Sequence, residues 1–158
     1  MDFEIIEFEA TDCFGIENHI TPENKKGNKI LNDMWETLMD SIDYSKIIYA
    51  FGVSKNFQLD TQEFDYNACV KEGTPLLKEM QAKKITIPGG RYAKFRFKGI
   101  MSSDAVEKFY TEVFSFSMTS GEVIPDMDRG INSFELYDES YRGMDDPESI
   151  FYILVPIK

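Results

Sequence analysis

The sequence predicts an α+β fold made of two successive halves, each with the order strand-strand-helix-strand-strand. Short segments in which apolar and polar residues alternate recur along the chain, a pattern typical of half-buried strands. Two other segments repeat apolar residues at three- and four-residue spacing, which indicates amphipathic helices. We expect one domain over 1–158, with halves at about 1–72 and 80–158. The fold should have antiparallel sheets, both helices on one face, and a ligand cleft between the halves.

The first half begins with strands over 3–9 and 13–19 and a polar loop over 21–28. A helix follows, since its apolar residues form one stripe at helical spacing. That stripe consists of Ile30, Leu31, Met34, Trp35, Leu38, Met39 and Ile42. Strands over 47–53 and 64–70 complete this half, and a Gly73-Thr74-Pro75 turn marks the boundary.

The second half repeats that order. Strands over 84–87 and 92–97 are joined by a tight Pro88-Gly89-Gly90 corner. The residues Ser102, Ser103 and Asp104 form an N-cap cluster for the next helix. The apolar face of that helix consists of Val106, Phe109, Tyr110, Val113 and Phe114. Strands over 132–137 and 149–157 close the half.

The composition indicates a folded protein and argues against several partners. Of the 158 residues, 42% are hydrophobic and 14% aromatic, which supplies a substantial core. The formal charge of −11 repels phosphate backbones, so we expect no direct binding to nucleic acid. No apolar run approaches the length of a membrane span, and the acidic N-terminus does not resemble a secretion signal. We therefore expect no membrane partner and a cytoplasmic location.

Several residues that often carry chemistry are better explained here without it. Cys13 and Cys69 lie far apart in apolar segments, so we interpret them as reduced core thiols. His19 is the only histidine and has no partner at metal-ligand or nucleophile spacing, which favours a surface residue. A strand rather than a helix follows Pro88-Gly89-Gly90, so this corner is not a phosphate loop. We expect no metal and no cofactor.

Glu135 is the clearest candidate for a functional residue. It lies within an otherwise apolar strand pattern, where burial of a carboxylate is costly. Strand alternation places Tyr137 on the same face as Glu135, and Phe134 and Leu136 on the other. Glu135 is therefore predicted to contact a positively charged ligand.

A structural role for Glu135 is the alternative. In that case Glu135 forms an ion pair with Arg91, Arg96 or Arg129 and only ties two strands together.

Several segments resemble GyrI-like effector-binding domains, which also form the C-terminal part of AraC-type and related drug-responsive regulators. The segment 87–95 with Lys98-Gly99 is similar to the I-P-A/G-G-x-Y-A-x-F-x-x-K/R-G motif of that family. Further matches in the same order are Met34-Trp35, 64–70, 129–137 and 150–153. The last two are most similar to the stand-alone, integron-associated subgroup. The resemblance spans nearly the whole chain.

The resemblance implies a cleft in which a buried glutamate meets the charge of a lipophilic cation among aromatic side chains. The matching glutamate here is Glu135. Candidate ligand-binding residues around it are Tyr137, Tyr66, Tyr152, Trp35 and Tyr92. For each of the last four, packing in the core is an equal alternative.

Three functions follow from these observations. The leading hypothesis is a stand-alone binding protein for lipophilic cations that acts as a sensor, a sequestering protein or the partner of a separate regulatory protein. Some relatives are understood to hydrolyse strained electrophilic rings with a pocket glutamate and an aromatic hydroxyl, so a hydrolase is the second. The third is an acidic protein-interaction module, similar to gyrase-inhibitor relatives.

Overall fold

The computed structural model describes residues 1–46 and 49–158, and within them the elements follow the predicted order. The helices are α1 (Lys29–Ser41) and α2 (Ser103–Thr119), with short 3-10 turns at Lys26–Asn28 and Tyr44–Lys46. The strands are β1 (Glu4–Phe8), β2 (Thr11–Ile20), β3 (Ala50–Lys55), β4 (Phe64–Lys71), β5 (Lys83–Ile87), β6 (Gly90–Lys98), β7 (Ser133–Tyr137) and β8 (Ile150–Pro156). Residues 47 and 48 of the predicted strand over 47–53 lie outside the described residues.

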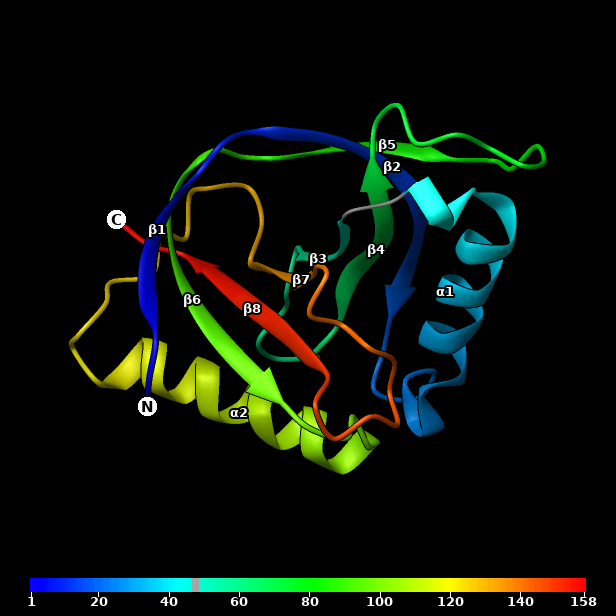
Figure 1. The fold of residues 1–158 in the computed structure, drawn as a ribbon. Helices are drawn as coiled ribbons and strands as arrows, with labels where there is room; N and C mark the ends of the chain where they lie inside the picture. The colour runs from blue at the N-terminus through cyan, green and yellow to red at the C-terminus, as the bar shows by residue number, and fades with distance from the viewer. Residues whose placement is uncertain (47–48) are drawn as a thin grey trace.

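The strands form one antiparallel sheet in the order β1-β6-β8-β7-β3-β4-β2-β5. The first strand of each half pairs with the second strand of the other half, since β1 pairs with β6 and β5 with β2. At the centre, β3 of the first half pairs with β7 of the second. The sheet curls into a half-barrel, with β1 and β2 arching across it (Figure 1). The predicted α+β class with duplicated halves is confirmed.

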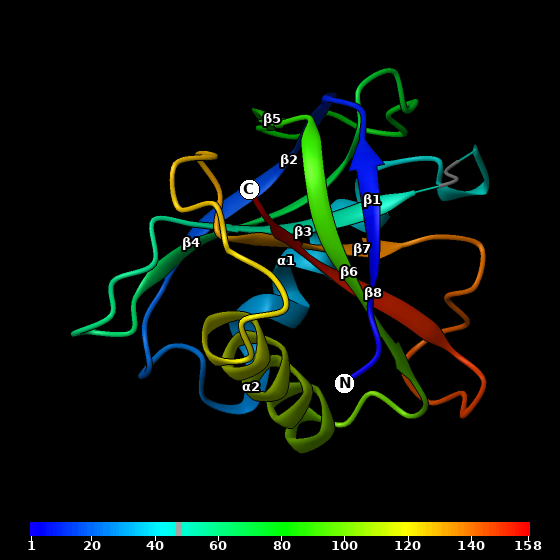
Figure 2. The ribbon, with the colours of Figure 1, turned by 90° about the vertical axis from the view of Figure 1, so that its left-hand side faces the viewer.

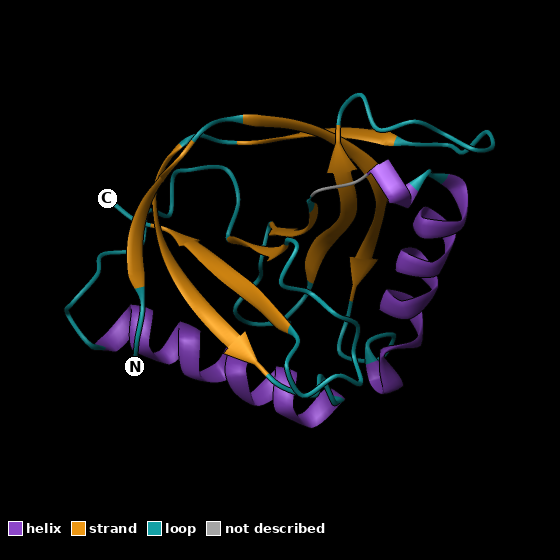
Figure 3. Cartoon of the chain, in the orientation of Figure 1, coloured by secondary structure: helices purple, strands orange, loops and turns teal. Residues whose placement is uncertain are grey.

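Both helices pack on the same face of this sheet, which we call the helix face (Figures 2 and 3). The apolar stripe of α1 packs on residues of β2 and β4, including Ile20 and Ala68. The apolar stripe of α2 packs on β6 and β8, including Phe95 and Ile153. The Ser102 hydroxyl accepts a hydrogen bond from the Ala105 amide at 3.2 Å, as the predicted N-cap cluster requires.

The opposite face of the sheet carries its own apolar core. This core includes Phe51, Tyr92 and Phe134, and Phe8 from the edge strand β1 packs against it. Cys13 and Cys69 are free thiols buried in the same core, in agreement with the sequence-based interpretation. The strong curl of the sheet thus lets the first strand of the chain cover apolar residues of the central strands.

Arg129 fixes the corner at Pro88-Gly89-Gly90. Its guanidinium donates hydrogen bonds to Asp126 Oδ2 at 3.1 Å and to the Ile157 carbonyl at 2.9 Å, and it lies over the Tyr92 ring. Gly90 has a φ of 130°, and a Cβ there would lie 2.6 Å from Arg129 Nη1. Glycine is therefore required where the chain turns from β5 into β6.

Neither described helix is both long and apolar enough to cross a membrane.

Candidate ligand-binding site

Glu135 lies at the centre of the sheet, beneath the two helices. It is the middle residue of β7, opposite Gly52 of β3 and Ile153 of β8. Its side chain is on the helix face, and the residue is only 7% exposed. A carboxylate in this position has lost nearly all of its contact with water.

Three tyrosine hydroxyls replace the lost water. Tyr66 on β4 donates to Glu135 Oε1 at 2.6 Å, and Tyr137 on β7 donates to the same oxygen at 3.0 Å. Tyr110 on α2 donates to Oε2. The carboxylate is therefore held by phenols from two strands and one helix.

Trp35 on α1 extends this network. Its indole Nε1–H donates to the Tyr66 hydroxyl oxygen at 3.1 Å, so the Tyr66 hydroxyl accepts from Trp35 and donates to Glu135. The Trp35 ring also meets the Tyr137 ring edge-to-face, with centroids 5.4 Å apart. We call Trp35, Tyr66, Tyr110 and Tyr137 the aromatic cage.

The ion-pair alternative for Glu135 is wrong. Among the described residues, the salt bridges do not include Glu135, and its side-chain partners are the three phenols. Arg129 pairs instead with Asp126, and Arg91 donates to the Lys158 carbonyl. Within the described residues, the hydrogen-bond donors to Glu135 are thus all neutral, and the charge of Lys25 acts on the carboxylate without forming an ion pair with it.

The pKa values of Glu135 and of the three tyrosines around it are all raised. Burial raises the pKa of Glu135 above its ordinary value of 4.5, and the hydrogen bonds from the three phenols oppose part of that rise. Burial, together with the adjacent carboxylate, raises the pKa of Tyr66, Tyr110 and Tyr137 well above the ordinary value of 10.0. The phenols therefore remain protonated and continue to act as donors.

Gly52 provides the space in which the carboxylate and Tyr66 meet. A Cβ at this position would lie 2.1 Å from Glu135 Oε1 and 2.2 Å from the Tyr66 hydroxyl oxygen. Both distances are far below van der Waals contact. Glycine in the middle of β3 is explained by this close approach rather than by a turn.

The structure brings four of the six predicted site residues together, namely Glu135, Tyr137, Tyr66 and Trp35. It does not bring Tyr92 and Tyr152 to them. Tyr92 is fully buried in the core of the opposite face and donates to the Pro88 carbonyl at 2.5 Å. Tyr152 also lies on that face, where its ring contacts Lys94 Nζ at 4.1 Å from the centroid.

The placement of Tyr152 follows from the strand register. Tyr66 and Tyr152 are each the third residue of the last strand in their half. However, Gly52 of β3 pairs with Ala68 of β4, and Glu135 of β7 pairs with Ile153 of β8. Tyr66 lies two residues before Ala68, so its counterpart in the second half is Phe151, two residues before Ile153. Phe151 does lie on the helix face and stacks on Tyr137. A shift of one residue moves a side chain to the other face.

Tyr110 and Gly52 were not predicted to belong to the site. Tyr110 was predicted as part of the apolar face of α2, and its polar hydroxyl on an otherwise apolar stripe was the available signal. For Gly52 the signal was a glycine inside a strand pattern, which often marks a close approach.

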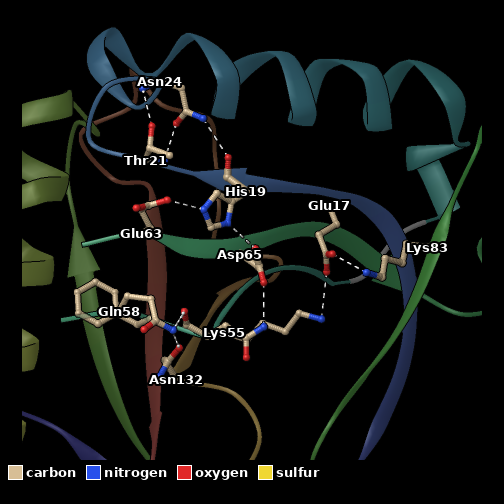
Figure 4. A network of polar contacts seen from close by, with 12 residues as sticks. Glu17, His19, Thr21, Asn24, Lys55, Gln58, Glu63, Asp65, Lys83 and Asn132 are labelled. Atoms are coloured by element: carbon tan, nitrogen blue, oxygen red, sulfur yellow. Dashed lines mark hydrogen bonds and ion pairs between the residues drawn. The ribbon is translucent and has the colours of Figure 1, made fainter. Parts of the chain in front are cut away.

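A second polar cluster surrounds His19 near the end of β2 (Figure 4). The His19 ring nitrogens lie 2.8 Å from Asp65 Oδ1 and 2.7 Å from Glu63 Oε1. Nearby, Glu17 pairs with Lys55 and Lys83. The His19 side chain is 55% exposed, as predicted for a surface residue. Within residues 1–46 and 49–158, no group of histidine, cysteine and acidic residues is arranged to hold a metal ion.

The cage covers the Glu135 carboxylate, with Tyr66 buried and Trp35, Tyr110 and Tyr137 half-buried. A hollow of about 500 Å³ lies elsewhere, between α1 and β2. It is lined by Ile16, Asn18, Asn24, Lys26, Lys29, Ile30, Asp33, Met34 and Thr37. Because Glu135 is only 7% exposed, a ligand can reach its carboxylate only if a ring of the cage moves aside.

Solved structures share this fold. An integron cassette protein from the mobile metagenome of Vibrio cholerae is 18% identical, with 99% of this chain and 95% of that chain covered and a TM-score of 0.69. SAV2435, in a structure with bound tetraphenylphosphonium, is 16% identical, with coverage of 100% and 94% and a TM-score of 0.68. EcmrR, from an EcmrR–DNA complex, is 13% identical, with coverage of 99% and 57% and a TM-score of 0.61.

Among curated protein sequences, none matches this chain. The family model described as GyrI-like small molecule binding domain matches residues 1–158. The match covers the full sequence, including both helices and the strand that carries Glu135. The chain is therefore a member of the family of GyrI-like small-molecule binding domains.

Proposed function

We propose that the protein binds lipophilic, positively charged small molecules at Glu135 and the aromatic cage. In this proposal it acts as a sensor or a sequestering protein, alone or together with a separate regulatory protein. The observation that carries the proposal is a buried carboxylate whose side-chain hydrogen bonds, within the part of the chain that the structure describes, all come from neutral phenols. Burial of this charge lowers the stability of the fold, and a bound cation would neutralise it.

The energetics of the site favour such a ligand. A cation beside Glu135 interacts in a medium of low polarity, where its attraction to the carboxylate is several times stronger than in water. Desolvation of both charges offsets part of this gain, so a weakly hydrated cation with apolar substituents is the best match. The ring faces of the cage add about 0.5 to 2 kcal/mol each through cation–π attraction.

The comparison with SAV2435 supports the same class of ligand. That protein shares the fold, and its structure contains tetraphenylphosphonium, a cation with four aromatic rings and no hydrogen-bond donor. A permanently charged phosphonium or ammonium ion with aryl groups is therefore the first ligand to test.

The cluster supports binding better than turnover. A hydrolase of strained rings would require a phenol to donate its proton to the leaving oxygen. Burial and the Glu135 charge raise the pKa of Tyr66, Tyr110 and Tyr137 well above that of an ordinary tyrosine, which makes them weaker acids. These phenols are well suited to hold a carboxylate in its ionised form.

Thermal unfolding tests this proposal. We expect tetraphenylphosphonium to raise the Tm of the protein, and the neutral aryl compound triphenylphosphine oxide to leave it nearly unchanged. At a cation concentration about a hundredfold above Kd, the stabilisation should be about 2.7 kcal/mol. Equal shifts with both compounds, or no shift with any lipophilic cation in a panel, would contradict the proposal.

A further inference from the structure

The Glu135 carboxylate has few hydrogen-bond positions left for a ligand. A carboxylate offers about four acceptor positions, two on each oxygen. Tyr66 and Tyr137 occupy both positions on Oε1, and Tyr110 occupies one on Oε2. Among the contacts of the described residues, a single position on Oε2 remains.

The phenols themselves offer little more. The Tyr66 oxygen already accepts a hydrogen bond from Trp35. The oxygens of Tyr110 and Tyr137 each keep a lone pair, but both are neutral acceptors. A neutral acceptor compensates a charged N–H group less well than a carboxylate does.

This arrangement matters because cations differ in how many hydrogen bonds they lose on burial. A primary ammonium ion has three N–H donors and is strongly hydrated. At Glu135 it would find one carboxylate position, and its other N–H groups would be left with weak acceptors or none. A quaternary ammonium or phosphonium ion has no N–H donor, so it requires only charge and ring faces.

We infer that Tyr110 determines the selectivity of the site. Its phenol occupies one of the two acceptor positions on Glu135 Oε2 and so directs binding toward cations that lack N–H donors and away from protonated amines. The inference rests on the proposed function, because it concerns which cation the same site accepts. Removing the Tyr110 hydroxyl would free a second position on Oε2 and let a protonated amine form one more charge-assisted hydrogen bond.

A matched pair of ligands tests the inference. The two cations are (biphenyl-4-ylmethyl)ammonium and its N,N,N-trimethyl form, both charged at about pH 7. Calorimetric titration gives the ratio of their Kd values for the wild type and for Tyr110→Phe. Comparison of this ratio between the two proteins cancels the intrinsic difference in hydrophobicity between the two ligands. Tyr152→Phe, the same change on the opposite face of the sheet, is the control.

We expect the wild type to bind the trimethyl cation more tightly than the primary amine. In Tyr110→Phe the affinity for the primary amine should rise about tenfold relative to the affinity for the trimethyl cation, which is the usual effect of one hydrogen bond to a charged group. In Tyr152→Phe it should remain at the wild-type value. If Tyr110→Phe does not fold, Tyr137→Phe frees a position on Oε1 and should shift the ratio in the same direction.

The possible failures are distinct. If the wild type binds cations and the ratio is the same in both cage variants, the inference is wrong and the proposed function stands. If the wild type binds the primary amine more tightly, the inference is also wrong. If the wild type binds neither this pair nor any other lipophilic cation, both the inference and the proposed function fail.

Discussion

Replacement of Glu135 by glutamine should abolish the response to lipophilic cations while the fold is retained. Glutamine keeps the shape of the side chain and one oxygen acceptor for Tyr66 and Tyr137, but it removes the charge. Loss of a buried counter-ion typically weakens binding by 2 kcal/mol or more, so we expect affinity to fall by about thirtyfold or more. Calorimetric titration of tetraphenylphosphonium into both proteins measures the change.

The stability of Glu135→Gln shows whether the fold is retained. Because burial raises the pKa of Glu135, the protonated form contributes stability that is fully present below the ordinary pKa of 4.5. That contribution is lost as the pH rises through the raised pKa. Without ligand, Glu135→Gln should therefore gain stability relative to the wild type as the pH rises above the ordinary pKa of 4.5. A variant that is markedly less stable than the wild type at neutral pH would instead indicate a structural role for the carboxylate.

Gly52→Ala should cause the largest loss of stability among single changes at the site. The added Cβ would overlap both Glu135 Oε1 and the Tyr66 hydroxyl, so one or both must leave their hydrogen bond. Overpacking and a buried polar group left without its partner each cost about 1 to 3 kcal/mol. We expect a total loss of about 2 to 5 kcal/mol and weaker cation binding, measured by urea unfolding and calorimetry.

Ser54→Ala is the matched control for this change. Ser54 lies two residues along β3, on the same face as Gly52. It should change the free energy of unfolding by less than about 1 kcal/mol. Equal effects of the two substitutions would show that close packing around Gly52 is not what holds the carboxylate.

The secondary structure could be predicted closely because it follows from local patterns. Alternation of apolar residues located the strands, and the Ser102 cap located the start of α2. The apolar stripe identified in the sequence ends at Phe114, whereas α2 continues to Thr119. The helix is prolonged by residues such as Phe116, which packs on Phe95 of β6 and on Phe3, just before β1, both distant in the sequence.

The site could be predicted only in part because its members meet through long-range pairing. Alternation within β7 correctly placed Tyr137 beside Glu135. The roles of Gly52 and Tyr110 depend on β3 lying next to β7 and on α2 lying above it, which no local pattern specifies. Tyr152 was placed on the wrong face because the register of β8 against β7 is fixed by tertiary contacts.

The most direct test of a cation site at Glu135 is a crystal structure with tetraphenylarsonium, whose arsenic atom is located by anomalous scattering. Our account predicts one strong arsenic peak beside the Glu135 carboxylate, with the Tyr110 hydroxyl still on Oε2 and the Trp35 ring moved aside for the phenyl rings. Arsenic in the hollow between α1 and β2, or against Tyr152 on the opposite face, with no arsenic beside Glu135, would contradict it.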